Sequence, residues 1–143
     1  MDDIDQGILG LLGADARMSL ATLARRLKIA RSTVQARLER LETSGVIAGY
    51  TLKLGEAARA SRIRATVLLT IEPRAQPGIL QRLKSLPEVE VVHTTSGHID
   101  LLLQVAAPNT ALLDDVLDRI GAMTGVKSSE SLIHLSTRLD RAV

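Results

Sequence analysis

Residues 19–45 read "SLATLARRLKIARSTVQARLERLETSG" and decide how the first half of the chain folds. Two helical patterns lie in this stretch, one after Ser19 and one over residues 31–44, and only three residues (28–30) connect them. In the second pattern Val34, Leu38 and Leu41 recur at the spacing of a buried helical stripe. Gly45 suits the position just after the last turn. Residues 20–39 are therefore predicted to form a helix-turn-helix motif.

The opposite face of the second helix carries small polar side chains and arginines. A helix that enters the DNA major groove needs compact groups in its first turns, where they reach base edges. Gln35 suits an adenine edge, Arg31 a guanine and Ala36 a thymine methyl group, whereas the remaining arginines suit phosphates. The predicted DNA-binding residues are Arg25, Arg26, Arg31, Ser32, Thr33, Gln35, Ala36, Arg37 and Arg40.

Positive charge is concentrated in the same region. The chain has 143 residues and a net charge of +2, but residues 1–64 carry +4 and residues 65–143 carry −2. Within residues 17–40 the net charge reaches +6. Such a concentration is typical of proteins that bind a polyanion. A solvated helical face is the other explanation for a run of charge, and the helix-turn-helix pattern favours DNA over it.

The motif is flanked by two further predicted elements. An apolar repeat at helical spacing predicts a first helix over residues 3–13, beginning beside Asp2 and Asp3. Residues 46–54 combine β character with a central glycine and predict a short wing, which makes the motif a winged helix-turn-helix. The predicted domains are therefore a DNA-binding domain over 1–54, a linker over 55–62 and a second domain over 63–143.

The second half has the order β-α-β-β-α-β. Strands are predicted over residues 63–71, 89–95, 99–106 and 126–136, and helices over 76–86 and 110–120. This order is that of a ferredoxin-like domain, so the predicted fold class is α+β. A weak internal repeat supports this prediction, because "RLKSLPEVEVV" from Arg82 and "RIGAMTGVKSS" from Arg119 align at an offset of 37 residues.

The pieces "DARMSLATLARRL", "STVQARLERLE" and "SGVIAGY" together resemble the DNA-binding domain of the Lrp/AsnC family of transcription regulators. The second half resembles the regulatory RAM domain of that family. The resemblance implies a regulator that is not an enzyme. It also implies homodimers formed through the sheet that assemble into octamers or similar rings, and a small-molecule effector that is often an amino acid. The family usually has Ser where Ala30 stands, which leaves Ser32 as an alternative helix start.

A candidate effector loop lies between the second and third strands. Its Gly97 and Asp100 resemble the family's effector loop, although Leu101 stands where the family commonly has an aromatic residue. Backbone N–H groups around Gly97 suit a carboxylate, and Asp100 suits an ammonium group. A plain hairpin turn with a structural aspartate stays open as the alternative. The predicted effector residues are Thr95, Ser96, Gly97, His98, Ile99, Asp100, Ser129 and Ser131, the two serines being contributed by a neighbouring subunit.

Composition excludes several function classes. The absence of cysteine removes disulfides and thiolate nucleophiles. The single aromatic residue argues against a base-stacking platform for single strands. We expect double-stranded DNA as the partner, a cytoplasmic location, and no membrane segment, metal, cofactor or catalytic residue. The alternative is a metabolite-binding module, or an Lrp-like enzyme using His93, His98 and Asp100, without DNA activity.

Overall fold

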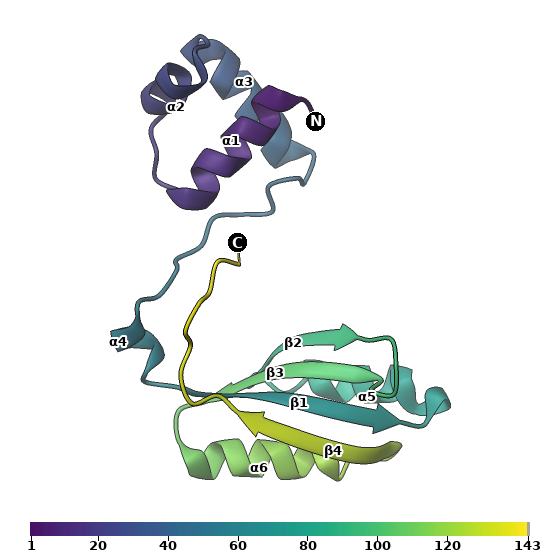
Figure 1. The fold of residues 1–143 in the computed structure, drawn as a ribbon. Coiled ribbons are helices and arrows are strands. Elements are labelled where there is room, and N and C mark those ends of the chain that lie inside the picture. The colour runs from purple at the N-terminus through teal and green to yellow at the C-terminus, as the bar shows by residue number, and fades with distance from the viewer. Residues whose placement is uncertain (143) are drawn as a thin grey trace. The chain divides into compact units, whose positions relative to one another are not determined.

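The computed structural model describes residues 1–142, which divide into two compact units (Figure 1). Residues Met1–Lys53 build the first unit and Leu54–Asp140 build the second. The first is helical, and the second is a sheet covered by helices, so the α+β class and the order of elements are confirmed. In the described part of the chain, none of the helices is long and apolar enough to cross a bilayer.

The first unit packs α1 (Asp3–Ala14), α2 (Leu20–Leu27) and α3 (Arg31–Thr43) around a small core. Ile8, Leu23, Val34 and Leu41 are almost completely buried, and Leu38 is partly buried beside them. Three residues connect α2 to α3, as the sequence predicts. The helix-turn-helix arrangement is therefore confirmed, and with it the inward orientation of the apolar stripe of α3.

Caps explain where these helices begin. The side chains of Asp2 and Asp5 form a reciprocal capping box at the start of α1, and Ser19 caps α2 through the Thr22 N–H at 3.1 Å. Ala30 provides no side-chain cap, yet α3 begins at Arg31, so the alternative start at Ser32 is wrong. The backbone carbonyl of Ala30 already accepts two N–H groups of the first turn, which is enough to start the helix.

The predicted wing over residues 46–54 is not present. The Ile47 N–H donates to the Leu41 carbonyl at 2.9 Å, and the chain then runs on without strand pairing. A strand needs a partner, and in the described residues every strand belongs to the sheet of the second unit. Tyr50 is half exposed, and burial together with the negative charge of Glu42 raises the pKa of its phenol. The predicted linker is likewise not fully irregular, since Glu56–Arg59 form a short helix, α4.

The second unit has one four-stranded antiparallel sheet in the order β2-β3-β1-β4. Its elements, in chain order, are β1 (Ile63–Ile71), a 3-10 turn (Pro73–Ala75), α5 (Gln76–Lys84), β2 (Val89–Thr94), β3 (Leu101–Ala107), α6 (Thr110–Gly121) and β4 (Val126–Ile133). This confirms the β-α-β-β-α-β order. β3 begins two residues later than predicted because the Thr95 N–H bonds the Asp100 carbonyl and closes the loop.

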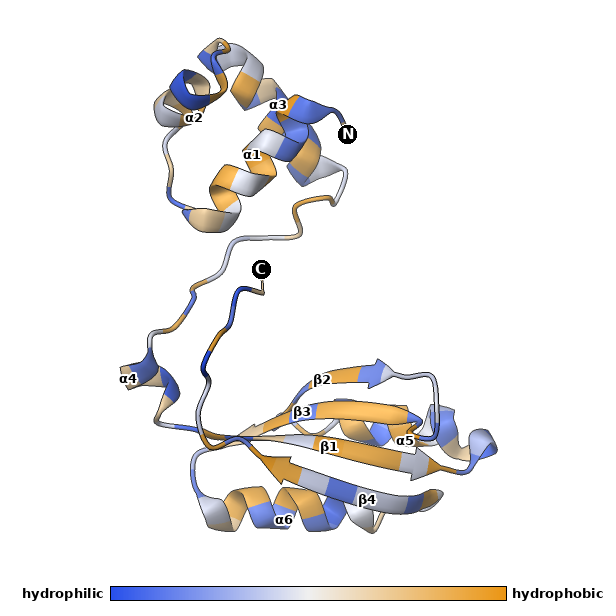
Figure 2. Ribbon diagram, in the orientation of Figure 1, coloured by the Kyte–Doolittle hydropathy of each residue, from blue (hydrophilic) through white to orange (hydrophobic). Residues whose placement is uncertain are grey.

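Both α5 and α6 lie on one face of the sheet (Figure 1). Alternate residues of β1, from Ala65 to Ile71, are buried against these helices. Figure 2 shows β3 as almost continuously apolar and α6 as amphipathic. The helices α5 and α6 leave the other face of the sheet uncovered, and its apolar side chains are only partly shielded, as for Val91 (38% exposed) and Leu132 (48% exposed).

The turn before β4 provides a test of this packing. Gly125 has φ +95°, and a Cβ placed there would lie 2.2 Å from the Ala75 Cβ. Gly97 has the same φ but open space around it. We expect Gly97→Ala to lower the free energy of unfolding by about 1–2 kcal/mol, because alanine is strained at this positive φ. Gly125→Ala should lower the free energy of unfolding by about 1–3 kcal/mol more than Gly97→Ala does, because its Cβ would overlap Ala75.

Urea denaturation at one fixed protein concentration measures both unfolding free energies. Equal losses in the two variants would contradict the close approach of Gly125 to Ala75.

Candidate functional site

The outward face of α3 and the adjacent end of α2 carry the predicted DNA-binding residues. Thr33 and Arg37 are half-buried, and the other seven are exposed, namely Arg25, Arg26, Arg31, Ser32, Gln35, Ala36 and Arg40. The Gln35 amide donates to the Glu39 carboxylate at 3.4 Å on this surface. A polar, accessible helix face lying opposite a buried apolar stripe is the geometry that a groove-binding helix requires.

A shallow hollow of about 310 Å³ lies along this face of α3. It is lined by Ser32, Thr33, Ala36, Arg37 and Arg40. Two hydroxyl groups and two guanidinium groups thus line one concave surface. Hydroxyl and guanidinium donors are the groups that proteins use for phosphate oxygens.

Arg37 is engaged by two carboxylates of α1. Its Nη1 donates to the Asp2 Oδ2 and lies 3.4 Å from the Asp5 Oδ1. The hydrogen bond from Arg37 holds the pKa of Asp2 at about 2, below its ordinary value of 3.8. The same bond raises the pKa of Arg37. The charge of Arg37 is therefore largely compensated within the first unit.

Asp5 also reaches the neighbouring arginine of α3. Its Oδ2 lies 3.5 Å from the Arg40 Nη2. Asp5 is only 3% exposed and is the one buried polar or charged residue of the described chain. The Arg40 side chain remains 63% exposed, whereas that of Arg37 is 23% exposed. Arg40 thus keeps most of its surface accessible, and Arg37 does not.

These ion pairs are absent from the predictions made from sequence. From sequence, Asp2 and Asp3 are predicted at the start of the first helix, and no role is assigned to Asp5. A local signal exists, because Asp5 lies between the apolar positions Ile4 and Ile8 and so falls next to the buried stripe. A charge at such a position needs a partner. Its partners are 32 and 35 residues away, which spacing alone cannot identify.

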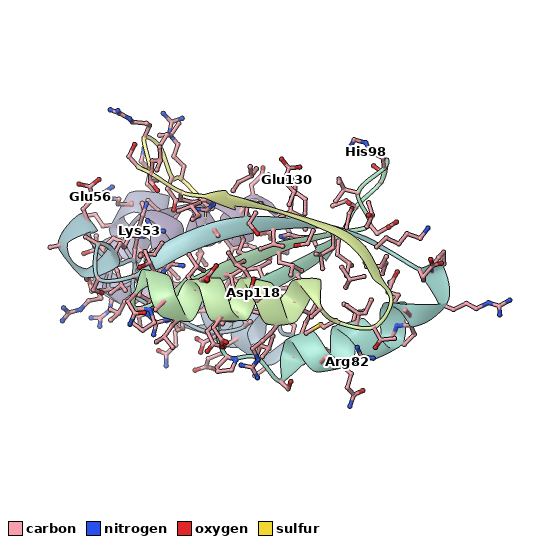
Figure 3. All side chains as sticks on the ribbon, turned by 90° about the horizontal axis from the view of Figure 1, so that it is seen from below. Lys53, Glu56, Arg82, His98, Asp118 and Glu130 are labelled. Atoms are coloured by element: carbon pink, nitrogen blue, oxygen red, sulfur yellow. The ribbon has the colours of Figure 1, made fainter. Side chains whose placement is uncertain are left out.

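The candidate effector loop spans residues 95–100, between β2 and β3. Thr95, Ser96, Gly97 and His98 are exposed, and Ile99 and Asp100 are half-buried. Figure 3 shows His98 at the tip of this loop. Gly97 adopts φ +95°, which glycine tolerates without strain. The structure thus places an open turn with accessible backbone at the predicted position.

Asp100 has a structural role within the chain. Its Oδ2 accepts a 2.8 Å hydrogen bond from the Ile71 N–H, where the pairing of β1 with β4 shifts register. Its N–H donates to the Leu69 carbonyl at 2.9 Å. Among the described residues no hydrogen-bond donor reaches the second carboxylate oxygen, Oδ1. One oxygen of Asp100 thus anchors the loop to β1.

The structure does not bring Ser129 and Ser131 to the loop of the same chain. Both are exposed on β4, at the sheet edge, and β1 separates them from β3. Ser129 pairs with Leu69 and faces α6, since a Cβ on Gly121 would lie 3.8 Å from the Ser129 Cβ. The neighbouring Ser128 faces the uncovered side of the sheet, where its hydroxyl bonds that of Thr70.

The three histidines lie apart from one another. His93 lies on β2, His98 at the loop tip, and the His134 Nε2 lies 2.7 Å from the Thr66 Oγ1. Within residues 1–142 no three acidic or histidine side chains gather as a metal site would require. A second hollow of about 400 Å³ lies between α6 and the end of β4, away from the loop residues. Its lining consists of Thr110, Ala111, Leu113, Asp114, Leu117 and Ile133.

Comparison with known proteins identifies both units. Residues 64–143 match the Lrp/AsnC ligand binding domain, and residues 1–42 match the AsnC-type helix-turn-helix domain. The HTH-type transcriptional regulator LrpA of Mycobacterium tuberculosis is 32% identical over 134 residues, which cover 93% of this chain and 89% of that protein.

Solved structures show the same fold over the full chain. Escherichia coli AsnC superimposes on this chain with a TM-score of 0.88 at 26% sequence identity. The match covers 100% of this chain and 97% of the AsnC chain. A Neisseria meningitidis transcriptional regulator, solved as a complex with L-Met, gives a TM-score of 0.87 at 24% identity. That match covers 98% of this chain and 93% of the other.

The pairing of Asp2 with Arg37 predicts a measurable titration. Because the pKa of Asp2 is lowered, the stabilisation from this pair is present above pH 3.8 and is lost as pH falls through about 2. Arg37→Gln removes the guanidinium that lowers the pKa of Asp2, so this pKa should rise toward 3.8. NMR titration of the Asp2 carboxyl group measures both values. An unchanged midpoint in Arg37→Gln would contradict the ion pair.

Proposed function

Because this chain belongs to the Lrp/AsnC family of transcription regulators, we propose that it binds specific DNA sequences through α3 and responds to a small molecule bound by its second unit. It is a helix-turn-helix regulator with a ligand-binding domain, and its relatives are named as regulators rather than as enzymes. The observation that carries the proposal is the orientation of α3. Val34 and Leu41 are buried, and the polar side opposite them is exposed.

The DNA contacts divide into two kinds in this proposal. Arg31, Gln35 and Ala36 lie in the first turns of α3, where a recognition helix meets base edges. Arg25, Arg26 and Arg40 are exposed and suit phosphates, which position the protein without reading sequence. The net charge of +6 over residues 17–40 supports a polyanion as the partner of this surface.

The active form in this proposal is a homodimer that assembles into an octamer or similar ring. The uncovered sheet face supports the dimer, because Leu68 and Leu102 lie at its centre with Val91 and Leu132 partly exposed around them. Two copies of α3 related by a two-fold axis then read two half-sites separated by one or more helical turns of DNA.

Salt dependence of DNA binding tests the proposal. A bound unit that makes about six phosphate contacts gives a slope of log affinity against log salt of roughly −5. Fragments selected for tight binding should bind more tightly than random fragments at every salt concentration. A metabolite-binding module without DNA activity would show neither the slope nor the preference, and this result would overturn the proposal.

Two variants separate the proposed roles on α3. Gln35→Ala should lower affinity for the selected fragment by about 1–3 kcal/mol at one base position and leave binding to random fragments almost unchanged. Arg40→Ala should weaken binding to both kinds of fragment alike and reduce the salt slope by about one. Equal losses on both fragments in Gln35→Ala would contradict base contact by Gln35.

The proposed effector is an amino acid bound at the loop of residues 95–100, near a subunit interface. The family description as a ligand binding domain supports a ligand in this unit. The loop offers backbone N–H groups beside Gly97 for a carboxylate and the Asp100 Oδ1 for an ammonium group. The loop is largely exposed in one chain, so Ser129 and Ser131 of a neighbouring copy complete the pocket in this proposal.

Asp100→Asn tests the effector site with little disturbance to the fold. The asparagine keeps an oxygen that accepts from the Ile71 N–H but removes the charge that pairs with an ammonium group. In a thermal-shift screen of the common amino acids, at least one should stabilise the unmodified protein, and Asp100→Asn should lose that shift. Asp114→Asn on α6 is the matched control and should keep it. An equal shift in Asp100→Asn would place the ligand elsewhere.

A further inference from the structure

The arginines of the proposed DNA-binding surface are not equivalent. Arg37 and Arg40 are paired with the carboxylates of Asp2 and Asp5. Arg25, Arg26 and Arg31 are exposed, and no carboxylate of the described residues forms an ion pair with them. Arg37 is therefore held within the first unit, whereas Arg40 stays 63% exposed beside Asp5 and Arg25, Arg26 and Arg31 are directed to solvent.

Arg37 lies where a phosphate would approach. Arg37 and Arg40 line the hollow on α3 together with Ser32, Thr33 and Ala36. The Arg37 Nη1 is bonded to the Asp2 Oδ2 and the Asp5 Oδ1, and the Arg40 Nη2 is bonded to the Asp5 Oδ2. A phosphate that approaches the Arg37 Nη1 must displace a carboxylate, and a phosphate that approaches its other N–H groups still lies close to two negative charges.

We infer that Asp2 and Asp5 limit the affinity for DNA of any sequence without touching DNA, by withholding Arg37 from phosphates. This inference rests on the proposed function. A guanidinium released from these carboxylates adds one phosphate contact on any sequence, and each such contact steepens the salt slope by about 0.9. Holding Arg37 back therefore lowers affinity for specific and non-specific DNA alike, because a phosphate contact does not read sequence.

Asp2→Asn is the variant that isolates this effect. Asparagine caps a helix as well as aspartate does, so α1 is retained. Asp2 is exposed, so the substitution is compatible with the core. Affinity for random DNA at about 0.1 M salt should rise roughly three- to tenfold, and the slope should steepen by about one. Affinity for the selected fragment should rise by a similar factor, because the released guanidinium contacts a phosphate and not a base.

Asp3→Asn is the matched control. Asp3 lies in the same first turn of α1 and is exposed, and the structure describes no ion pair between it and α3. The substitution removes the same charge from the same region. Affinity for random DNA should change by less than about twofold, the size of a screened surface effect. Equal gains in Asp2→Asn and Asp3→Asn would overturn the inference, because the gain would then be a general charge effect.

Arg37→Gln completes a double-mutant cycle. Because Arg37 is withheld from phosphates, Arg37→Gln alone should leave the salt slope on random DNA almost unchanged. In the Arg37→Gln background, Asp2→Asn should no longer raise affinity for random DNA. A flatter slope in Arg37→Gln alone, or a gain from Asp2→Asn that persists without Arg37, would also overturn the inference.

Failure of the inference is distinguishable from failure of the proposed function. If the unmodified protein shows no salt-dependent DNA binding, the proposed function fails, and with it the premise of the inference. If the unmodified protein binds with the expected slope but the cycle shows no coupling between Asp2 and Arg37, only the inference fails. Thermal melting of each variant confirms that the changes in affinity are measured on folded protein.

Discussion

The burial of Val34 and Leu41 in the three-helix core is the interaction on which the rest of the first unit depends. The unit contains only about fifty residues, and its core has no aromatic side chain to add area. A helix rotated about its axis would expose this stripe and lose burial that amounts to about 1.5–3 kcal/mol for each large aliphatic side chain. The rotation of α3, and therefore the set of side chains that face outward, follows from this packing.

The second unit also buries one apolar surface, but it does so by covering one face of its sheet with helices. Its two crossover connections place α5 and α6 on one face of the sheet, where Ala65, Val67, Leu69 and Ile71 are buried (Figure 1). The other face has no cover from its own helices, and its strands carry a mixture of apolar and polar side chains there. Figure 3 marks Arg82 and Asp118 on the outer helices and His98 at the exposed turn. The unit therefore presents distinct surfaces, each with its own chemistry.

The parts of the structure that local patterns determine are the parts that sequence predicts well. The spacing of Val34 and Leu41, the cap at Ser19 and the order of elements after residue 62 all follow from neighbouring residues. The prediction of a wing was wrong because residues 46–54 have strand-like composition but no partner strand among the described residues. The pairing of Arg37 with Asp2 and the bond from Ile71 to Asp100 join distant segments, so no local pattern reveals them.

Tyr50 gives the chain an internal reporter at the boundary of its two units. It is the only tyrosine, and there is no tryptophan, so all intrinsic fluorescence of the protein originates from this ring. Burial, with the nearby charge of Glu42, raises the pKa of its phenol, and the emission of a tyrosine is sensitive to such a neighbour. A rearrangement of the segment after α3 can therefore be followed through the fluorescence of Tyr50 without an added dye.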